Sequence, residues 1–227
     1  MISLFVRSYP KDFQWLQYSV QSMRKNLIGI SDRVLTVPHG SQIPDDISSF
    51  FDRIYYTVET HPGYLAQQID KVRAYTQCKY SNILFSDSDC MYYTPFDARK
   101  MLVADKITLY KTKYSSMSGD VLVWRPIMHV ATGILPDWEY MRCFPIMHKA
   151  YVCKALDTLS TYNNYLQIVQ PNNLSEFNAL GIVAETYFPD SYNFVDTEVS
   201  LPVQTCKQYW SWGGITPDIS RELHSNL

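Results

Sequence analysis

The chain has 227 residues, 46% of them hydrophobic, and a formal net charge of -2, which fits one α/β domain with a large core and excludes a long-range electrostatic pull toward nucleic acid or anionic membranes. Its five cysteines are widely spaced and include no CxxC pair, which argues against a disulfide scaffold and a structural zinc site and favours reduced thiols in a cytoplasmic protein. The first residues lack the apolar core of a signal peptide, and no apolar run approaches the roughly 18 residues of a membrane span.

The first part of the chain predicts alternating strands and helices. Residues 2–9 form a short, β-rich apolar run and predict a buried strand. Apolar residues then recur at steps of three and four from Phe13 to Leu27, which predicts an amphipathic helix with Asp12 as its N-cap. Further strands are expected at 33–38, 53–59 and 82–85, with a second helix at 64–78.

This order of elements predicts the fold class. Strands that alternate with helices are typical of an α/β layer with a mainly parallel mixed sheet flanked by helices. Such sheets bind ligands beyond the carboxyl ends of their strands. Arg7, Ser8 and Tyr9 follow the first strand there, and Asp87 and Asp89 follow the strand at 82–85.

In the second part of the chain, fewer segments show a sequence pattern that predicts a helix or a strand. A short helix is expected at 95–104, strands at 106–114 and 120–124, and helices at 147–159 and 175–188. We find no internal repeat and no linker, so residues 1–227 are expected to form a single domain.

The two aspartates of "SDSDC" need an explanation, because buried charge is costly unless it is paired, hydrogen-bonded or bound to a cation. In an extended chain, residues two apart point to the same side, so Asp87 and Asp89 can converge on one point. A divalent cation between them is one interpretation, and a solvated Asp-Ser-Asp turn is the other.

In its order of motifs the chain resembles a GT-A-type glycosyltransferase, most closely a group of small bacterial and viral proteins of that kind. The resemblance rests on a first strand ending in Arg7, a helix bearing glutamine and lysine, and a strand ending in D-x-D. An E-F-N helix start and a Trp/Gly-rich segment at 209–215 follow. It implies a GT-A-like, Rossmann-type nucleotide-binding fold. Residues 1–95 would bind the nucleotide-sugar, and 96–227 would supply the acceptor half and a C-terminal lid.

The resemblance also implies a metal site. The D-x-D carboxylates would hold Mn²⁺ or Mg²⁺ against the diphosphate of a nucleotide-sugar, with a UDP-hexose as the expected donor. Asp89 would be the direct, catalytically required ligand, and Asp87 would lie nearer the ribose and metal-bound water. A late histidine often completes such sites, which favours His224.

Several side chains are candidates for contacts with the donor. Tyr9 could stack on the base, and Arg7 could approach a phosphate or the uracil edge; a surface-paired arginine is the alternative. The resemblance suggests that Gln68, or its neighbour Gln67, reaches the nucleotide-sugar together with Lys71, although these positions are equally typical of a solvated helix face.

The resemblance suggests that Glu176 is the general base that accepts a proton from the acceptor hydroxyl. The alternative is a capping box with Asn173 as N-cap, and Asp137 and Glu139 are competing carboxylates.

Trp210 and Trp212 suit either a flexible lid with aromatic platforms for a sugar or a packed aromatic plug.

Two other functions remain open at this point. A nucleotidyltransferase would also hold Mg²⁺ between paired aspartates, but the residues after the first strand contain no glycine. A non-catalytic carbohydrate-binding module could use the 18 Tyr, 10 Phe and 5 Trp side chains. The acceptor and the stereochemical outcome stay undetermined, and a glycan is favoured over a modified DNA base because the near-neutral charge argues against a polyanionic acceptor.

Overall fold

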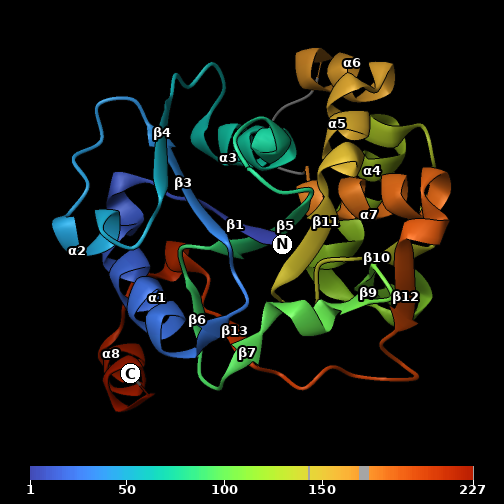
Figure 1. Ribbon diagram of the computed structural model, residues 1–227. Coiled ribbons are helices and arrows are strands. Elements are labelled where there is room, and N and C mark those ends of the chain that lie inside the picture. Colours follow the sequence, from blue (N-terminus) through green and yellow to red (C-terminus); the bar gives the residue numbers. More distant parts are fainter. Residues whose placement is uncertain (143, 169–173, 227) are drawn as a thin grey trace.

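The structure, a computed structural model, describes residues 1–142, 144–168 and 174–226 (Figure 1). It contains a five-stranded central sheet in the order β11-β5-β1-β3-β4. These strands are β1 (Ile2–Arg7), β3 (Asp32–Pro38), β4 (Arg53–Thr57), β5 (Asn82–Asp87) and β11 (Ile146–Lys149). All neighbours are parallel except β11, which runs antiparallel to β5. The predicted α/β fold with a mainly parallel mixed sheet is therefore confirmed.

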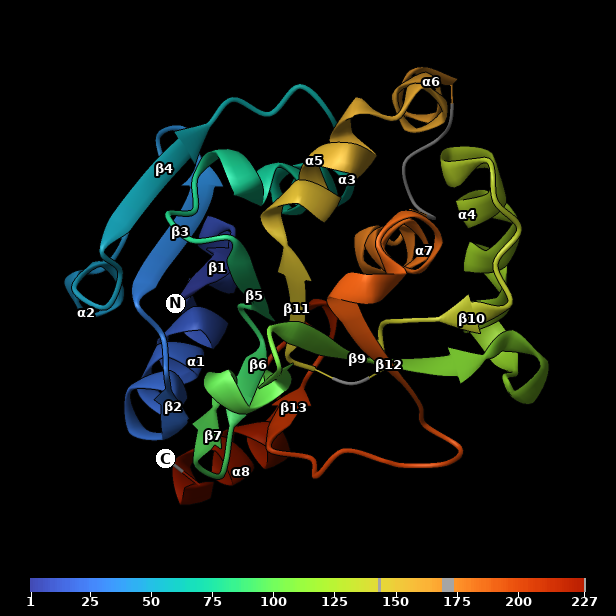
Figure 2. The same ribbon diagram turned by 45° about the vertical axis from the view of Figure 1, so that its right-hand side comes forward.

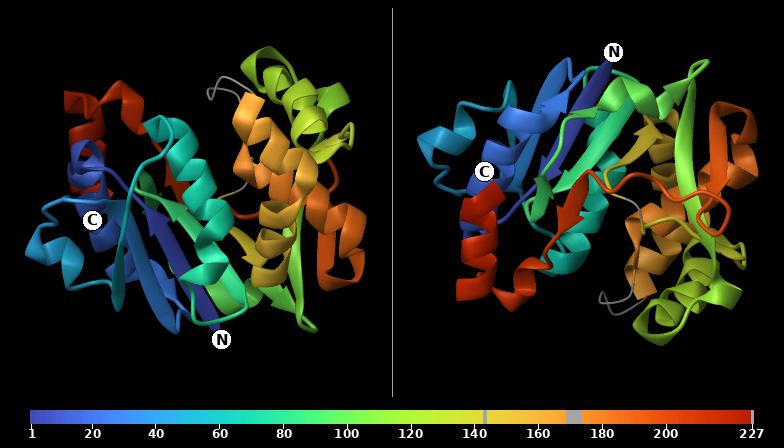
Figure 3. Two further views of the ribbon diagram at one scale, coloured as in Figure 1. Left: turned by 90° about the horizontal axis from the view of Figure 1, so that it is seen from above. Right: turned by 90° about the horizontal axis from the view of Figure 1, so that it is seen from below.

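Helices cover both faces of this sheet. The connection from β1 to β3 runs in one direction across the sheet, and the connection from β4 to β5 returns in the other. Because such crossovers are right-handed, the helices that make them lie on opposite faces, as Figures 2 and 3 show. These helices are α1 (Phe13–Asn26) and α3 (Gly63–Val72).

A smaller sheet and further helices complete the chain. The long strand β9 (Lys106–Lys113) pairs with β8 (Leu102–Val103), β10 (Trp138–Glu139) and β12 (Tyr192–Asp196). Short pairs join β2 (Leu27–Ile28) to β7 (Phe96–Asp97) and β6 (Cys90–Tyr92) to β13 (Cys206–Gln208). The remaining helices are α2 (Asp45–Ser48), α4 (Trp124–Thr132), α5 (Ala150–Thr158), α6 (Ser160–Ile168), α7 (Glu176–Tyr187) and α8 (Pro217–Asn226).

One cluster of buried apolar side chains runs through both sheets, from Leu4 and Phe85 in the central sheet to Leu109 in β9 and Phe177 in α7. Burial of such a cluster is the main stabilising contribution to a fold of this kind. Among the helices of the described ranges, none has the length and apolarity needed to cross a bilayer.

The structure corrects three predicted elements. Residues 120–124 are not a strand, because a 3₁₀ turn (Gly119–Val123) leads into α4. The helix predicted at 147–159 begins only at Ala150, because the preceding residues extend the central sheet as β11. The helix predicted at 95–104 is a single 3₁₀ turn (Ala98–Met101) between two short strands.

The strand order fixes where a ligand would bind. β1 and β5 are neighbours, and the chain crosses to opposite sides of the sheet around them. Their carboxyl ends thus border the topological switch point, the usual ligand site of such sheets. Arg7 and Asp87 are partners in the β1–β5 register at this edge.

Candidate functional site

A cavity of about 570 Å³, which we call the strand-end cavity, lies at this switch point. Its walls come from the carboxyl ends of β1 and β5, from α3, from the start of α7 and from the segment that follows β13. Most of the predicted site residues line it, namely Tyr9, Gln68, Lys71, Asp87, Asp89, Glu176 and Trp210. The structure therefore brings together side chains from positions 9 to 210 of the chain.

The D-x-D carboxylates are both buried in the wall of this cavity. Asp87 is the last residue of β5, and its Oδ2 accepts a hydrogen bond of 3.2 Å from Gln208 Nε2. Asp89 Oδ2 accepts one of 2.7 Å from the backbone N–H of Ser211, whereas its buried Oδ1 has no hydrogen-bond partner within the described ranges. The interpretation as a solvated turn is therefore wrong.

Lys71 joins two carboxylates that line the cavity. Its Nζ lies 2.5 Å from Asp87 Oδ1 and 2.7 Å from Glu176 Oε1, and all three side chains are buried. Burial works to lower the pKa of Lys71, but the charges of Asp87 and Glu176 outweigh it and hold that pKa above its usual value. The alternative of a solvated helix face is wrong for Lys71 and for Gln68, which is also buried.

Glu176 is not part of a capping box. It is the first residue of α7, and the N-cap is Ser175, whose hydroxyl accepts a hydrogen bond from the Asn178 backbone N–H. The predicted N-cap, Asn173, lies outside the described residues. Because Glu176 follows its N-cap directly, its carboxylate is free of the reciprocal capping bond and turns to Lys71 instead.

The two aspartates fit a divalent cation. Burial, followed by the negative charge of Asp87, raises the pKa of Asp89 to about 6. A cation would relieve this repulsion, and the unpartnered Oδ1 of Asp89 could coordinate it. No group of three His, Cys, Asp or Glu side chains suited to a metal occurs within the described ranges, so phosphate and water oxygens would have to complete the coordination, as is usual for Mg²⁺.

His224 does not line the strand-end cavity. It lies on α8, where its Nδ1 is 2.7 Å from the Ser220 backbone oxygen and its Nε2 is 3.5 Å from Tyr18 Oη. Nothing in this arrangement directs its ring toward Asp89, so its role as a metal ligand stays a prediction without geometric support.

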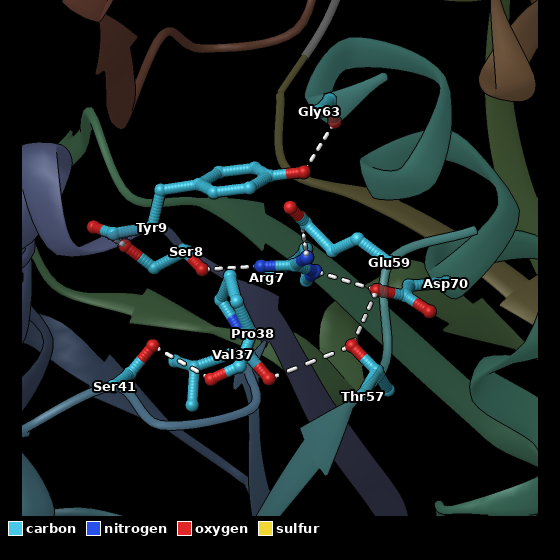
Figure 4. A network of polar contacts seen from close by, with 10 residues as sticks. All are labelled: Arg7, Ser8, Tyr9, Val37, Pro38, Ser41, Thr57, Glu59, Gly63 and Asp70. Carbon is cyan, nitrogen blue, oxygen red and sulfur yellow. Dashed lines mark hydrogen bonds and ion pairs between the residues drawn. The ribbon is translucent and has the colours of Figure 1, made fainter. Parts of the chain in front are cut away.

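Arg7 holds Tyr9 rather than facing the cavity, which corrects the predicted direct contact with a nucleotide. Its side chain is 0% exposed, with Nε 2.6 Å from Asp70 Oδ2 and Nη2 3.0 Å from Glu59 Oε1. The guanidinium carbon lies 4.2 Å from the centre of the Tyr9 ring (Figure 4). Tyr9 also donates a hydrogen bond to the Gly63 backbone oxygen, which fixes the ring at the cavity wall.

Ser8, the remaining predicted residue of this strand end, is buried and does not line the cavity. Its backbone oxygen accepts a hydrogen bond from Arg7 Nη1. We therefore assign Ser8 to the support of Arg7 and not to the ligand.

The C-terminal segment covers the D-x-D residues. Strand β13 pairs with β6, and the Tyr209 backbone N–H donates to the Asp89 backbone oxygen at 3.1 Å. Trp210 follows with φ of 56°, a left-handed conformation that is uncommon outside glycine, and lines the cavity while 49% exposed. The Trp212 side chain lies outside what the structure describes.

The competing carboxylates do not reach the strand-end cavity. Glu139 is fully buried, and burial raises its pKa to about 7. The Asp137 side chain is 83% exposed and pairs with Arg125. Among the carboxylates weighed as a base, only Glu176 faces the cavity.

Sequence reasoning missed Gln208 and Ser211, which contact the two aspartates. Both lie in or next to the aromatic segment at 209–215, so their position beside that motif was the one available signal. Their contacts with Asp87 and Asp89 span more than 120 positions, and no local pattern predicts such a distance.

Comparison of the sequence with models of known protein families finds no match, and comparison with curated proteins finds none either. The interpretation of the strand-end cavity therefore depends on its own residues.

Proposed function

We propose that this chain is a metal-dependent glycosyltransferase of GT-A type, which moves a hexose from a nucleotide-sugar, most simply a UDP-hexose, to an acceptor hydroxyl. The observation that carries the proposal is the position of Asp87 and Asp89 in one cavity wall, at the switch point between β1 and β5. Nucleotide-containing ligands are typical of such a position.

Asp87 and Asp89 would hold Mn²⁺ or Mg²⁺. When bound, the cation neutralises the charge that develops on the leaving diphosphate. Because Lys71 already pairs with Asp87, one carboxylate is held in a fixed position before any ligand arrives. Asp89 keeps one buried oxygen without a hydrogen bond within the described ranges, which supports its role as the direct ligand.

Tyr9 and Trp210 supply aromatic surfaces to the strand-end cavity. Tyr9 is held from behind by Arg7 and at its hydroxyl by Gly63. A ring fixed in this way loses little conformational freedom when a nucleobase stacks on it. We assign Tyr9 to the base and Trp210 to the sugar.

Glu176 is the proposed general base. In the transfer, the bond between the sugar C1 and the diphosphate oxygen breaks, and a bond from C1 to the acceptor oxygen forms. The acceptor proton passes to Glu176. Lys71 binds Oε1 of this carboxylate, so Oε2 is the oxygen we assign to the proton.

Binding of the donor tests the proposal. Melting temperature is measured with UDP-glucose, UDP-galactose and UDP, each with and without Mn²⁺, because a ligand of the folded state raises apparent stability. We expect the shift to require both nucleotide and metal, and we expect UDP release on incubation. ATP and CTP serve as the comparison for a nucleotidyltransferase, and UDP-sugar binding without UDP release would indicate a binding module instead.

A further inference from the structure

A second cavity, of about 600 Å³, adjoins the strand-end cavity; we call it the side cavity. Its volume falls in the range of ligand-binding pockets, roughly 300–1,000 Å³. The two cavities share five of their lining residues, namely Trp124, Met141, Phe144, Gln208 and Trp210. A molecule in the side cavity would therefore lie directly beside one in the strand-end cavity.

The two cavities differ in charge. Four carboxylates line the strand-end cavity, those of Asp12, Asp87, Asp89 and Glu176, together with two lysines, Lys11 and Lys71. In contrast, the described residues that line the side cavity include Arg142 and Lys207 but no carboxylate. The charged side chains that line the side cavity within the described residues are thus all cationic, which favours an anionic ligand there.

Arg142 is the cation best placed to bind a ligand. Its side chain is 48% exposed, and its ion pair within the described ranges is with Glu139, whose Oε2 lies 4.0 Å from Nε. This separation exceeds hydrogen-bond length, so the planar fork of the guanidinium is not used up by Glu139. Lys207 is already bound to Glu222 at 2.6 Å and adds less.

Aromatic rings form much of the remaining wall. Trp124, Phe144 and Trp210 offer flat apolar surfaces of the kind that pack against the faces of a sugar ring. Gln204 and Gln208 add amide groups that can hydrogen-bond to hydroxyls. A sugar with a single anionic group would match aromatic walls, amides and one arginine fork together.

We propose that the side cavity binds the acceptor, and that this acceptor is a sugar carrying a carboxylate or phosphate group that pairs with Arg142. The role of this sugar as the acceptor rests on the proposed function, whereas the binding of an anionic sugar in the side cavity does not. Binding experiments without a donor therefore test the site separately.

The probes are methyl β-glucuronide, glucose 6-phosphate and the neutral methyl β-glucoside, titrated by calorimetry against the full chain. We expect at least one anionic sugar to bind about ten-fold or more tightly than the glucoside, because a hydrogen bond to a charged group is stronger than a neutral one. The two anionic arms distinguish a carboxylate from a phosphate. Equal affinity for all three sugars, or no binding of any, would overturn the proposal.

Variants of Arg142 test whether this residue causes the preference for anionic sugars. Arg142→Gln should abolish the preference for the anionic sugar. Arg142→Lys keeps a positive charge beside Glu139 and should therefore retain part of this preference. Arg73→Gln is the matched control, because its side chain is 51% exposed, pairs with Asp157 and lines neither cavity. An unchanged preference in Arg142→Gln would contradict the site.

The two proposals can fail separately. Melting-temperature shifts with UDP-hexose and Mn²⁺ should be the same in Arg142→Gln and wild type, since Arg142 does not line the strand-end cavity. Anion preference without any donor binding would leave the site standing and overturn the glycosyltransferase. If both hold, the anionic sugar should increase UDP release over the glucoside, and this increase should be lost in Arg142→Gln.

Discussion

Lys71 Nζ lies 2.7 Å from Glu176 Oε1, a buried ion pair that joins α3 to the first residue of α7 across 105 positions. The same ammonium holds Asp87 at the end of β5. The pair therefore links two parts of the chain that both line the strand-end cavity. The charges of Lys71, Asp87 and Glu176 therefore fix the positions of these side chains in the cavity and also contribute to the stability of the fold.

Removing the charge of Lys71 should destabilise the protein strongly. In Lys71→Met, two buried carboxylates lose their cation, and breaking a buried pair in this way costs about 3–5 kcal/mol. Urea denaturation monitored by far-UV circular dichroism measures the loss. Lys100→Met, a change at an exposed position, is the control and should stay within about 0.5 kcal/mol of wild type. Equal stability of the two variants would show that the buried pair contributes nothing.

Asp89→Asn should abolish metal-dependent donor binding without loss of the fold. The asparagine oxygen can still accept the hydrogen bond from the Ser211 backbone N–H, and the substitution removes repulsion with Asp87. Calorimetry with UDP and Mn²⁺ measures the binding, and Asp137→Asn, at a highly exposed carboxylate, is the control. UDP binding with unchanged dependence on Mn²⁺ would remove Asp89 from the metal site.

The strand ends were predictable because they depend on local pattern. The apolar runs that finish at Arg7 and Asp87 predict two strands, and parallel strands bring their carboxyl ends to one edge. The direction of each side chain was not predictable. Arg7 is enclosed by Glu59 and Asp70, which lie 52 and 63 positions away, and no local pattern shows that these carboxylates occupy its donors.

The second part of the chain was harder to predict because its elements are short and depend on distant partners. Residues 121–124 are apolar and include two β-branched valines, yet Leu122 and Val123 are exposed and Trp124 begins a helix. His148 is polar and falls in the helix predicted at 147–159, but it is buried in β11 beside Phe85. Tertiary context decides the structure of such segments over local propensity.

Burial of His148 should make the protein sensitive to acid. Burial lowers the pKa of His148 to about 3, below the usual value near 6.5. The neutral form is favoured in the folded state, so this contribution to stability is full above pH 6.5 and is lost as the pH falls toward 3. Between pH 6.5 and 4.5 the loss is about 2 kcal/mol.

Urea denaturation at several pH values measures this loss against His148→Phe, which cannot be protonated. The stability difference between wild type and variant should change by about 2 kcal/mol over that interval. His39→Gln, at an exposed histidine without such burial, should follow wild type. A difference that stays constant with pH would contradict the assignment.

Arg7 and Tyr9 should respond differently to mutation, because only Tyr9 lines the cavity. Tyr9→Ala should weaken binding of free UDP by about ten-fold, since stacking on an aromatic ring is worth roughly 1–3 kcal/mol per base. Arg7→Met should weaken binding and also lower the melting temperature, because Glu59 and Asp70 lose their buried partner. Calorimetry with UDP and thermal melts separate the two effects. Weaker UDP binding in Arg7→Met at an unchanged melting temperature would favour a direct contact of Arg7 with the nucleotide.

Glu176→Gln should remove the general base and keep the local structure. The glutamine amide oxygen can still accept a hydrogen bond from Lys71, which now lies 2.7 Å from the carboxylate, and the N-cap bond of Ser175 is unaffected. UDP-hexose affinity should therefore stay near that of wild type. Turnover should fall by roughly 10²–10⁴-fold, the usual loss when a general base is removed. The product should have the inverted anomeric configuration, because a retaining reaction needs no such base. Near wild-type transfer by Glu176→Gln, or a retained configuration, would limit Glu176 to positioning Lys71, and the buried triad with Asp87 would then be structural.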